Sequence, residues 1–268
     1  MPAYLFDLDG TLYQGDGAVP GAPELIARLR HDGVPFRFVT NTTSRPRSAL
    51  VTRLRGYGFA LEEREIFSAL RAGADLAREM GCDSIIPLVP PAALEDLAGF
   101  QLAGGTSGQP LSARTGCTAV VVGDLGALWS YVLVQEAFNA LMDGACFIAL
   151  SRDRYWMSAT GLTIDCGAFV HALEYATGAE SVLAGKPSPA FYRAAVRSMG
   201  LGNDTDITMI GDDLASDVGG AQQAGYRGYL VQTGKFREGI LGQSEIRPDR
   251  ILSSVAALLD STPPRPEP

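Results

Sequence analysis

Two carboxylates separated by one residue follow an apolar run at the start of the chain. The run, residues 3–6, is typical of a buried parallel strand, and Asp7 and Asp9 come where it ends, followed by Gly10 and Thr11. Ligand sites in open α/β sheets lie just beyond the carboxyl ends of strands. Two acids this close repel each other, and a bound cation relieves that repulsion. An ordinary turn is the alternative, because Asp and Gly are common turn residues.

Three later apolar segments end in the same way, in polar residues that suit a phosphate or a metal ion. Residues 35–39 lead to Thr40 and Asn41, residues 181–184 lead to Gly185 and Lys186, and residues 206–210 lead to Asp212, Asp213 and, one helical turn on, Asp217. A strand end that feeds a helix start offers hydroxyls and backbone N–H groups to a phosphate, although Ser, Thr and Asn also serve as N-caps. Asp124 follows a similar strand at residues 118–122, but it would not reach the cation if this region is a separate domain, and it is interpreted as a turn residue.

The full string from Asp7 to Leu12 resembles the first motif of the haloacid dehalogenase superfamily of aspartate-nucleophile phosphohydrolases, and the later strand ends match its other motifs in order. The resemblance covers essentially the whole chain. It implies an α/β fold, with a doubly wound parallel-sheet (Rossmann-like) core and an inserted α/β cap domain. The expected domains are a core in two parts, residues 1–70 and 181–262, a cap at residues 71–180 and a disordered tail at residues 263–268.

The long insertion is similar to the class II cap of the pyridoxal and nucleotide phosphatases. Within this branch, six segments most resemble the phosphatases of phospholysine, phosphohistidine and inorganic pyrophosphate: residues 154–155, 172–175, 185–189, 211–213, 217–222 and 233–237. Those phosphatases carry Ser at the position of Asp9, whereas the pyridoxal and nucleotide phosphatases carry Asp. The difference favours hydrolysis of ordinary phosphomonoesters.

The resemblance also implies a role for each residue of the motifs in a Mg²⁺-dependent hydrolysis of small phosphorylated metabolites through an aspartyl-phosphate. Asp7 would be the nucleophile and Asp9 the general acid and base. The phosphate would be held by Thr40, Asn41 and Lys186. The Mg²⁺ ligands would be the carboxylates of Asp7 and Asp212 and the backbone carbonyl of Asp9. Asp213 or Asp217 would orient metal-bound water, with Asp217 favoured by the spacing of the motif. Arg154, Asp165, Cys166 and Gly167 would contribute to substrate specificity.

Other functions remain open at this point. One is hydrolysis of phospholysine, phosphohistidine or pyrophosphate; another is a phosphotransferase or mutase that uses the same aspartyl-phosphate. A non-enzymatic protein that binds a phosphorylated ligand is a further alternative, although binding alone does not need Asp9. A dinucleotide-binding oxidoreductase is excluded, because the first strand is not followed by the Gly-x-Gly-x-x-Gly turn.

Charge and cysteine content limit the partners and the cellular location that can be expected. A net charge of −8 argues against a nucleic-acid or anionic-membrane binder. No early segment combines a basic start with a long apolar stretch, so we expect neither a secretory signal nor a membrane anchor. The four cysteines, Cys82, Cys117, Cys146 and Cys166, are widely separated, which is typical of small buried apolar residues rather than of structural zinc. We therefore expect a cytoplasmic enzyme. The resemblance to the family, whose members often associate through the cap, implies a homodimer formed through the cap.

Overall fold

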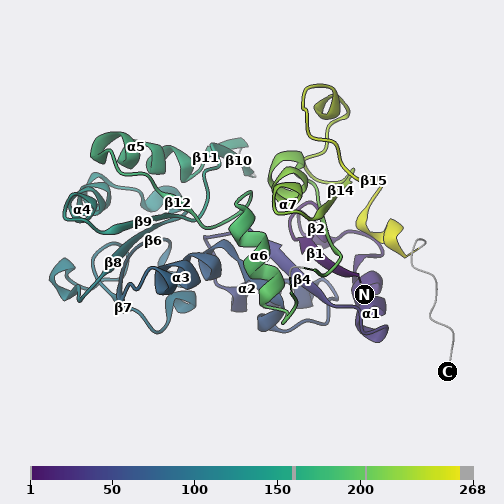
Figure 1. Ribbon diagram of the computed structural model, residues 1–268, viewed down its shortest axis with the longest axis horizontal. Helices are drawn as coiled ribbons and strands as arrows, with labels where there is room; N and C mark the ends of the chain where they lie inside the picture. The colour runs from purple at the N-terminus through teal and green to yellow at the C-terminus, as the bar shows by residue number, and fades with distance from the viewer. Residues whose placement is uncertain (1, 159–160, 203, 260–268) are drawn as a thin grey trace. The chain divides into compact units, whose positions relative to one another are not determined.

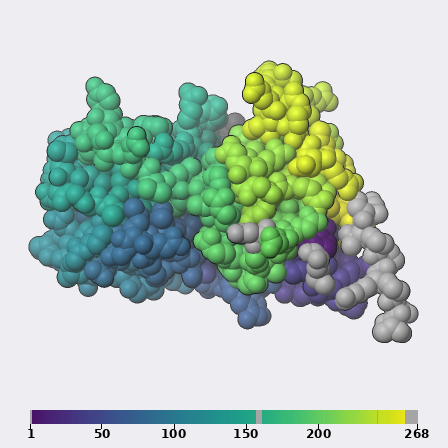
Figure 2. All heavy atoms as spheres, viewed as in Figure 1, coloured from purple at the N-terminus to yellow at the C-terminus, as the bar shows by residue number. Residues whose placement is uncertain are grey.

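The computed structural model describes residues 2–158, 161–202 and 204–259, and the chain divides into two compact units. The first, here called the core unit, consists of residues 1–40, 48–67 and 186–268. The second, here called the inserted unit, consists of residues 41–47 and 68–185. Figure 1 shows the strands and helices of each unit, and Figure 2 shows the heavy atoms from the same side. The predicted tail at residues 263–268 lies outside the described residues.

A six-stranded sheet in the order β15-β14-β13-β1-β4-β5 forms the centre of the core unit. Its strands are β1 (Ala3–Asp7), β4 (Phe36–Thr40), β5 (Ile66–Ser68), β13 (Ile207–Gly211), β14 (Arg227–Val231) and β15 (Arg250–Leu252). The strand β1 pairs in parallel with β4 and β13, and β14 pairs in parallel with β13 and β15. Every residue of β4 and β13 is buried, as expected for parallel strands that are covered on both faces.

Helices and short segments complete the core unit. The helices are α1 (Ala22–His31), α2 (Arg47–Gly56), α6 (Pro189–Arg197) and α7 (Gly220–Gln223), and a π-helical segment at Leu214–Gly219 precedes α7. A two-stranded ribbon of β2 (Tyr13–Gln14) and β3 (Gly17–Ala18) lies between β1 and α1 in the chain. Among the described residues, no helix is both long enough and apolar enough to cross a membrane.

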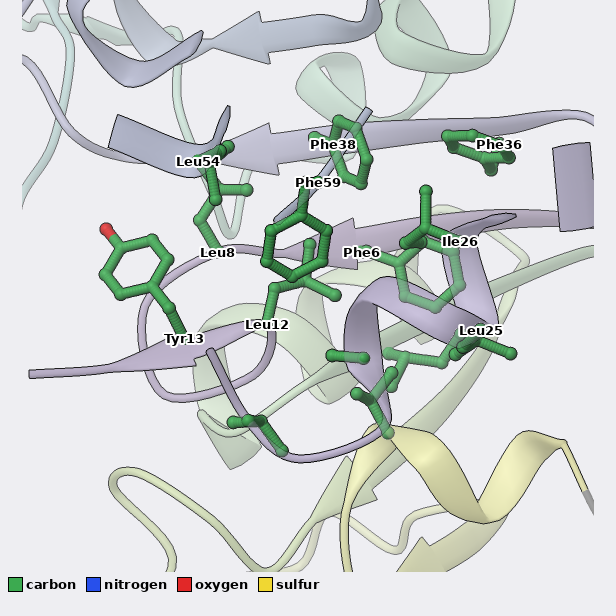
Figure 3. Packing of buried hydrophobic residues seen from close by; sticks show 14 of the residues in the cluster. Phe6, Leu8, Leu12, Tyr13, Leu25, Ile26, Phe36, Phe38, Leu54 and Phe59 are labelled. Carbon is green, nitrogen blue, oxygen red and sulfur yellow. The ribbon is translucent and has the colours of Figure 1, made fainter. Parts of the chain in front are cut away.

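Apolar packing on one side of the core sheet fixes the loop that follows β1. Phe6 and Phe38 come from neighbouring strands, Ile26 comes from α1, and all three side chains are almost completely buried. Figure 3 shows them packed together with Phe59 and with Leu12 from the loop itself. Because buried side chains anchor the loop on this side, the backbone that carries its carboxylates is held in place.

The inserted unit contains a parallel five-stranded sheet in the order β12-β9-β8-β6-β7. The strands are β6 (Ser84–Leu88), β7 (Gln101–Leu102), β8 (Thr118–Val122), β9 (Cys146–Ala149) and β12 (Val182–Leu183). The helices are α3 (Ala69–Glu79), α4 (Tyr131–Met142) and α5 (Gly167–Thr177), and an antiparallel hairpin joins β10 (Tyr155–Ser158) to β11 (Gly161–Ile164). The predicted α/β class with parallel sheets is therefore confirmed.

One strand lies in a different sheet from the one expected. The segment at residues 181–184 was expected to be a core strand ending at Lys186, but its strand β12 pairs with β9 of the inserted unit, with Val182 opposite Ile148. Its short apolar pattern predicts a strand without specifying which sheet it joins. Asp124, two residues beyond the end of β8, is a turn residue, as expected, since its carboxylate accepts a hydrogen bond from the Gly126 N–H at 2.8 Å.

Candidate active site

Four charged side chains meet at the carboxyl edge of the core sheet. Asp7 ends β1 and Asp212 follows β13, and the pairing of Phe6 with Ile210 places these two strand ends side by side. The Lys186 ammonium lies 2.5 Å from Asp7 Oδ1 and 2.7 Å from Asp217 Oδ1. All four side chains are buried, with Asp217 at 0% exposure. The structure therefore joins residues from three of the four predicted motifs in one cluster.

Three carboxylates crowd this cluster, and only Lys186 among the four brings a positive charge. One oxygen from each of Asp7, Asp212 and Asp217 lies within 4.8 Å of the others. Burial, followed by the repulsion of Asp7 and Asp217, raises the pKa of Asp212 to about 8. Burial likewise raises the pKa of Asp217 to about 7, although the Lys186 ammonium opposes the shift. A divalent cation with oxygen ligands would relieve this repulsion, and so the residues present fit a Mg²⁺ ion.

Lys186 keeps its charge in this buried position. Burial alone would lower its pKa, but the Asp217 and Asp7 carboxylates outweigh that effect and raise the pKa well above its usual value. The ammonium therefore places a fixed positive charge beside the Asp7 carboxylate. This charge reduces the repulsion that the carboxylates of the cluster would exert on an anionic phosphate.

Two glycines leave room for the Asp212 carboxylate. Gly10 has φ +81°, and a Cβ there would lie 2.1 Å from Asp212 Oδ2; a Cβ on Gly234 would lie 2.0 Å from the same atom. The Lys235 N–H donates to Asp212 Oδ2 at 2.7 Å, and the Thr233 hydroxyl donates to the Gly10 carbonyl. The loop after β14 therefore holds both the first motif and Asp212 in place.

Asp217 and Asp213 have different local roles. The second oxygen of Asp217 accepts the Asp213 N–H at 3.1 Å, so that this carboxylate connects Lys186 to the backbone after β13. Asp213 caps the following helical segment by accepting the N–H groups of Ala215 and Ser216, and it pairs with the Lys235 ammonium at 2.9 Å. Burial would raise the pKa of Asp213, but these partners, Lys235 first, lower it overall.

Asp9 lies two residues beyond Asp7 and is exposed. Partial desolvation, followed by the repulsion of the Asp7 carboxylate, raises the pKa of Asp9, whereas the guanidinium of Arg53 opposes the shift. Arg53 itself is held by two contacts. Its Cζ atom lies over the Tyr13 ring, 4.6 Å from the ring centroid, and its guanidinium donates a 2.7 Å hydrogen bond to the Gly15 carbonyl. An exposed acid with a raised pKa is suited to carry a proton to a leaving group.

The predicted phosphate-binding residues other than Lys186 lie at the end of β4. Thr40 is buried, and the pairing of Asp7 with Val39 places it one residue beyond the strand partner of Asp7. Asn41 is assigned to the inserted unit, where a Cβ on Gly185 would lie 2.7 Å from its side-chain oxygen. The role of Asn41 in phosphate binding stays a prediction.

The four predicted specificity residues belong to the inserted unit, with Arg154 directly before β10 and Asp165, Cys166 and Gly167 directly after β11. The Asp165 N–H donates to the Arg154 carbonyl, and the Asp165 carboxylate accepts the Cys166 N–H at 2.6 Å. Cys166 is completely buried in an apolar cluster that includes Val170, so its side chain is part of the core of this unit. Gly167 allows close packing, because a Cβ there would lie 2.5 Å from the Arg152 carbonyl oxygen. Of these four, Arg154 is exposed and Asp165 is partly exposed, whereas Cys166 and Gly167 are buried.

Several residues of the site were missed by the reasoning from sequence. Gly234 and Lys235 fix Asp212, and Tyr192 is a fully buried residue whose hydroxyl donates to the Ser216 carbonyl beside Asp217. The available signal was a Gly-Lys pair directly after the apolar strand β14, the same pattern that identified Lys186. Tyr192 gave no such signal, because an aromatic residue in α6 is indistinguishable from ordinary core.

Comparisons with known proteins identify the family. A family model for haloacid dehalogenase-like hydrolases matches residues 4–102, and a second, HAD-hydrolase-like, matches residues 183–258. Haloacid dehalogenase-like hydrolase domain-containing protein 2 of Bos taurus is 41% identical, over 88% of this chain and 86% of its own length. Phospholysine phosphohistidine inorganic pyrophosphate phosphatase of Rattus norvegicus is 35% identical, over 96% of this chain and 92% of its own.

Solved structures agree with the sequence relatives. A 4-nitrophenylphosphatase from Thermotoga maritima superposes with a TM-score of 0.84 at 25% identity, covering 96% of each chain. A glycerol phosphate phosphatase from Mycobacterium tuberculosis, in complex with magnesium, superposes with a TM-score of 0.79 at 25% identity, covering 96% of this chain and 75% of its own. The resemblance predicted from the four motifs is thereby confirmed, and the chain belongs to the haloacid dehalogenase-like hydrolase family.

Proposed function

We propose that this chain is a Mg²⁺-dependent phosphatase that hydrolyses small phosphomonoesters through a phosphate ester of Asp7. The observation that carries the proposal is the buried cluster of Asp7, Asp212 and Asp217 with Lys186, which combines a nucleophile, a cation site and a fixed positive charge. Positioning and electrostatic stabilisation of this kind account for most of the catalysis of phosphoryl transfer.

The carboxylates would hold Mg²⁺, with Asp7 and Asp212 as ligands and the Asp9 backbone carbonyl as a third. The ion supplies positive charge between the carboxylate nucleophile and the anionic phosphate. Asp217 fits a supporting role, since its oxygens already bind Lys186 and the Asp213 N–H. The magnesium in the related glycerol phosphate phosphatase supports the choice of ion.

The nucleophilic step falls to Asp7. Its carboxylate would attack phosphorus while the P–O bond to the leaving group breaks, and water would then hydrolyse the acyl phosphate and restore the carboxylate. The Lys186 ammonium, 2.5 Å from Asp7 Oδ1, would balance the negative charge that builds up there. The Thr40 hydroxyl and the backbone of Asn41 would hold the remaining phosphoryl oxygens.

Asp9 would supply the proton balance of both steps. In the first step it would protonate the departing alkoxide, and in the second it would take a proton from the attacking water, a role that typically contributes roughly 10²–10⁴-fold. Its raised pKa and its exposed position fit an acid that faces a substrate. Mg²⁺ binding alone does not require the Asp9 side chain.

A second candidate function is hydrolysis of phospholysine, phosphohistidine or pyrophosphate. The 35% identity to the rat phosphatase of that name, over 96% of this chain, supports it. Asp9 favours phosphomonoesters instead, because an alkoxide leaving group requires a proton. The preference between P–O and P–N bonds is therefore decided by a substrate panel.

The test measures phosphate release from alkyl and aryl phosphomonoesters, pyrophosphate and phospholysine, with and without Mg²⁺. Asp7→Asn is the test variant, and Asp16→Asn, which changes a fully exposed acid in the same loop region, is the matched control. Mg²⁺-dependent release that is lost in Asp7→Asn and kept in Asp16→Asn is expected. Release that survives Asp7→Asn, or that does not depend on Mg²⁺, contradicts the proposal. The predicted cytoplasmic location and the homodimer through the cap stay predictions.

A further inference from the structure

Three cysteines that are far apart in sequence converge at one end of the sheet of the inserted unit. Cys82 Sγ lies 3.0 Å from Cys117 Sγ, and Cys117 Sγ lies 3.9 Å from Cys146 Sγ. All three sulfur atoms lie within 4.8 Å of one another. They are separate from the carboxylates of the proposed active site, all of which belong to the core unit.

Strand pairing produces this convergence. β6, β8 and β9 are neighbouring parallel strands, so their starting ends meet at the same edge, with Ser84 opposite Thr118 and Ala119 opposite Cys146. Cys117 directly precedes this paired region and Cys82 lies two residues before it, and the N–H groups of Asp83 and Ser84 both donate to the Cys117 carbonyl. The backbone of the sheet therefore holds the three thiols together.

Burial explains only one of the three cysteines. Cys82 is 6% exposed, as expected for a small apolar residue, but Cys117 is exposed and Cys146 is partly exposed. A pocket of about 410 Å³ lies beside Cys117 and is lined in part by Arg114, Thr118 and Asp143. The cluster is thus open to solvent on one side, and the prediction of four buried apolar cysteines is wrong for Cys117 and Cys146.

We propose that Cys82, Cys117 and Cys146 form a binding site for a thiophilic cation, Zn²⁺, with water from the adjoining pocket as the fourth ligand. Thiolates select soft or borderline ions such as Zn²⁺, whereas the carboxylates of the core unit select Mg²⁺. Zn–S bonds of about 2.3 Å at tetrahedral angles place sulfur atoms about 3.8 Å apart. The Cys117–Cys146 separation already has this value, and the Cys82–Cys117 pair needs to open by less than about 1 Å.

The charge balance of binding follows from the state of the thiols. Zn²⁺ binds cysteine as the thiolate and not as the neutral thiol. Each coordinated thiol must lose its proton, and binding of Zn²⁺ therefore releases protons to the solvent. The affinity is accordingly expected to decrease as the pH falls.

The test titrates the full chain with Zn²⁺ against a chromophoric chelator, after reduction with a phosphine and removal of metals. Co²⁺ serves as a spectroscopic probe of thiolate ligation. The test variants are Cys117→Ser and Cys146→Ser, and Cys166→Ala removes the fourth cysteine, whose sulfur instead contacts the Ser151 carbonyl. Circular dichroism verifies that each variant is folded.

Binding of one equivalent of Zn²⁺ is expected for the wild type and for Cys166→Ala. Loss of a ligand should weaken binding by more than about 100-fold in Cys117→Ser and Cys146→Ser and remove the thiolate-to-cobalt absorption, since even an outer-shell change costs 10–100-fold. Failure of the reduced wild-type chain to bind Zn²⁺ overturns the proposal. Binding that survives both serine substitutions also overturns it. So does the finding that Cys82 and Cys117 form a disulfide and that the chain binds no zinc after this disulfide is reduced.

Discussion

Gly10 offers a direct test of how the backbone positions the proposed metal ligand Asp212. In Gly10→Ala, the new Cβ would lie 2.1 Å from Asp212 Oδ2, whereas nonbonded carbon and oxygen atoms are rarely closer than 3.0 Å. The carboxylate must therefore move by about 1 Å, against the hydrogen bond that it accepts from the Lys235 N–H. Mg²⁺ requires near-ideal octahedral geometry at about 2.0–2.1 Å. We expect the affinity for Mg²⁺ to fall at least about tenfold, which corresponds to about 1.4 kcal/mol.

Gly15→Ala is the matched control, because Gly15 lies in the same region with φ +59° and a Cβ there would meet no atom within 4 Å. Both variants carry the cost of a left-handed conformation, about 1–2 kcal/mol in stability. Only Gly10→Ala should lose Mg²⁺ affinity. Thermal unfolding measures the first effect, and the Mg²⁺ dependence of phosphate release measures the second. Equal Mg²⁺ affinity in the two variants would refute the reasoning.

Three further predictions follow from the same cluster. Without metal, the free energy of unfolding should fall as the pH rises from about 6 to 8, by up to about 1.4 kcal/mol per pH unit for each proton. The reason is that native Asp212, with a pKa of about 8, and native Asp217, with a pKa of about 7, hold protons that the unfolded chain has released. Urea unfolding measures this slope, and saturating Mg²⁺ should flatten it. Lys186→Met should lower the metal-free stability by about 3–5 kcal/mol, since two buried carboxylates lose their partner, and a loss under 1 kcal/mol in the same assay would contradict the ion-pair assignment. Asp9→Asn should reduce kcat for an alkyl phosphate by roughly 10²–10⁴-fold and far less for an aryl phosphate with a good leaving group, while equal losses on both would contradict its acid–base role.

Most of the site could be predicted because its residues follow parallel strands. Asp7, Thr40 and Asp212 each come directly after an apolar segment, and parallel strands bring their carboxyl ends to one edge. The local sequence therefore contained both the chemistry and its place in the fold. Lys186 was identified by its motif, although the short strand before it joins the other sheet.

Contacts that depend on register between distant segments were not predictable. The fit of Asp212 between Gly10 and Gly234 involves three loops, and no local periodicity specifies it. The cysteine cluster is similar, since Cys82 and Cys117 lie 35 residues apart and meet only because β6 pairs with β8. In both cases the strand pairing decides which side chains meet, and sequence spacing does not report it.

The most direct test of the central claim is to trap the covalent intermediate. A single turnover in the presence of Mg²⁺ with a ³²P-labelled phosphomonoester is quenched in acid, and the labelled peptide is mapped by mass spectrometry. The account predicts one phosphoryl group on Asp7, formed at least as fast as phosphate is released and absent from Asp7→Asn. Turnover without a phosphorylated Asp7, or a label on any other residue, would contradict it.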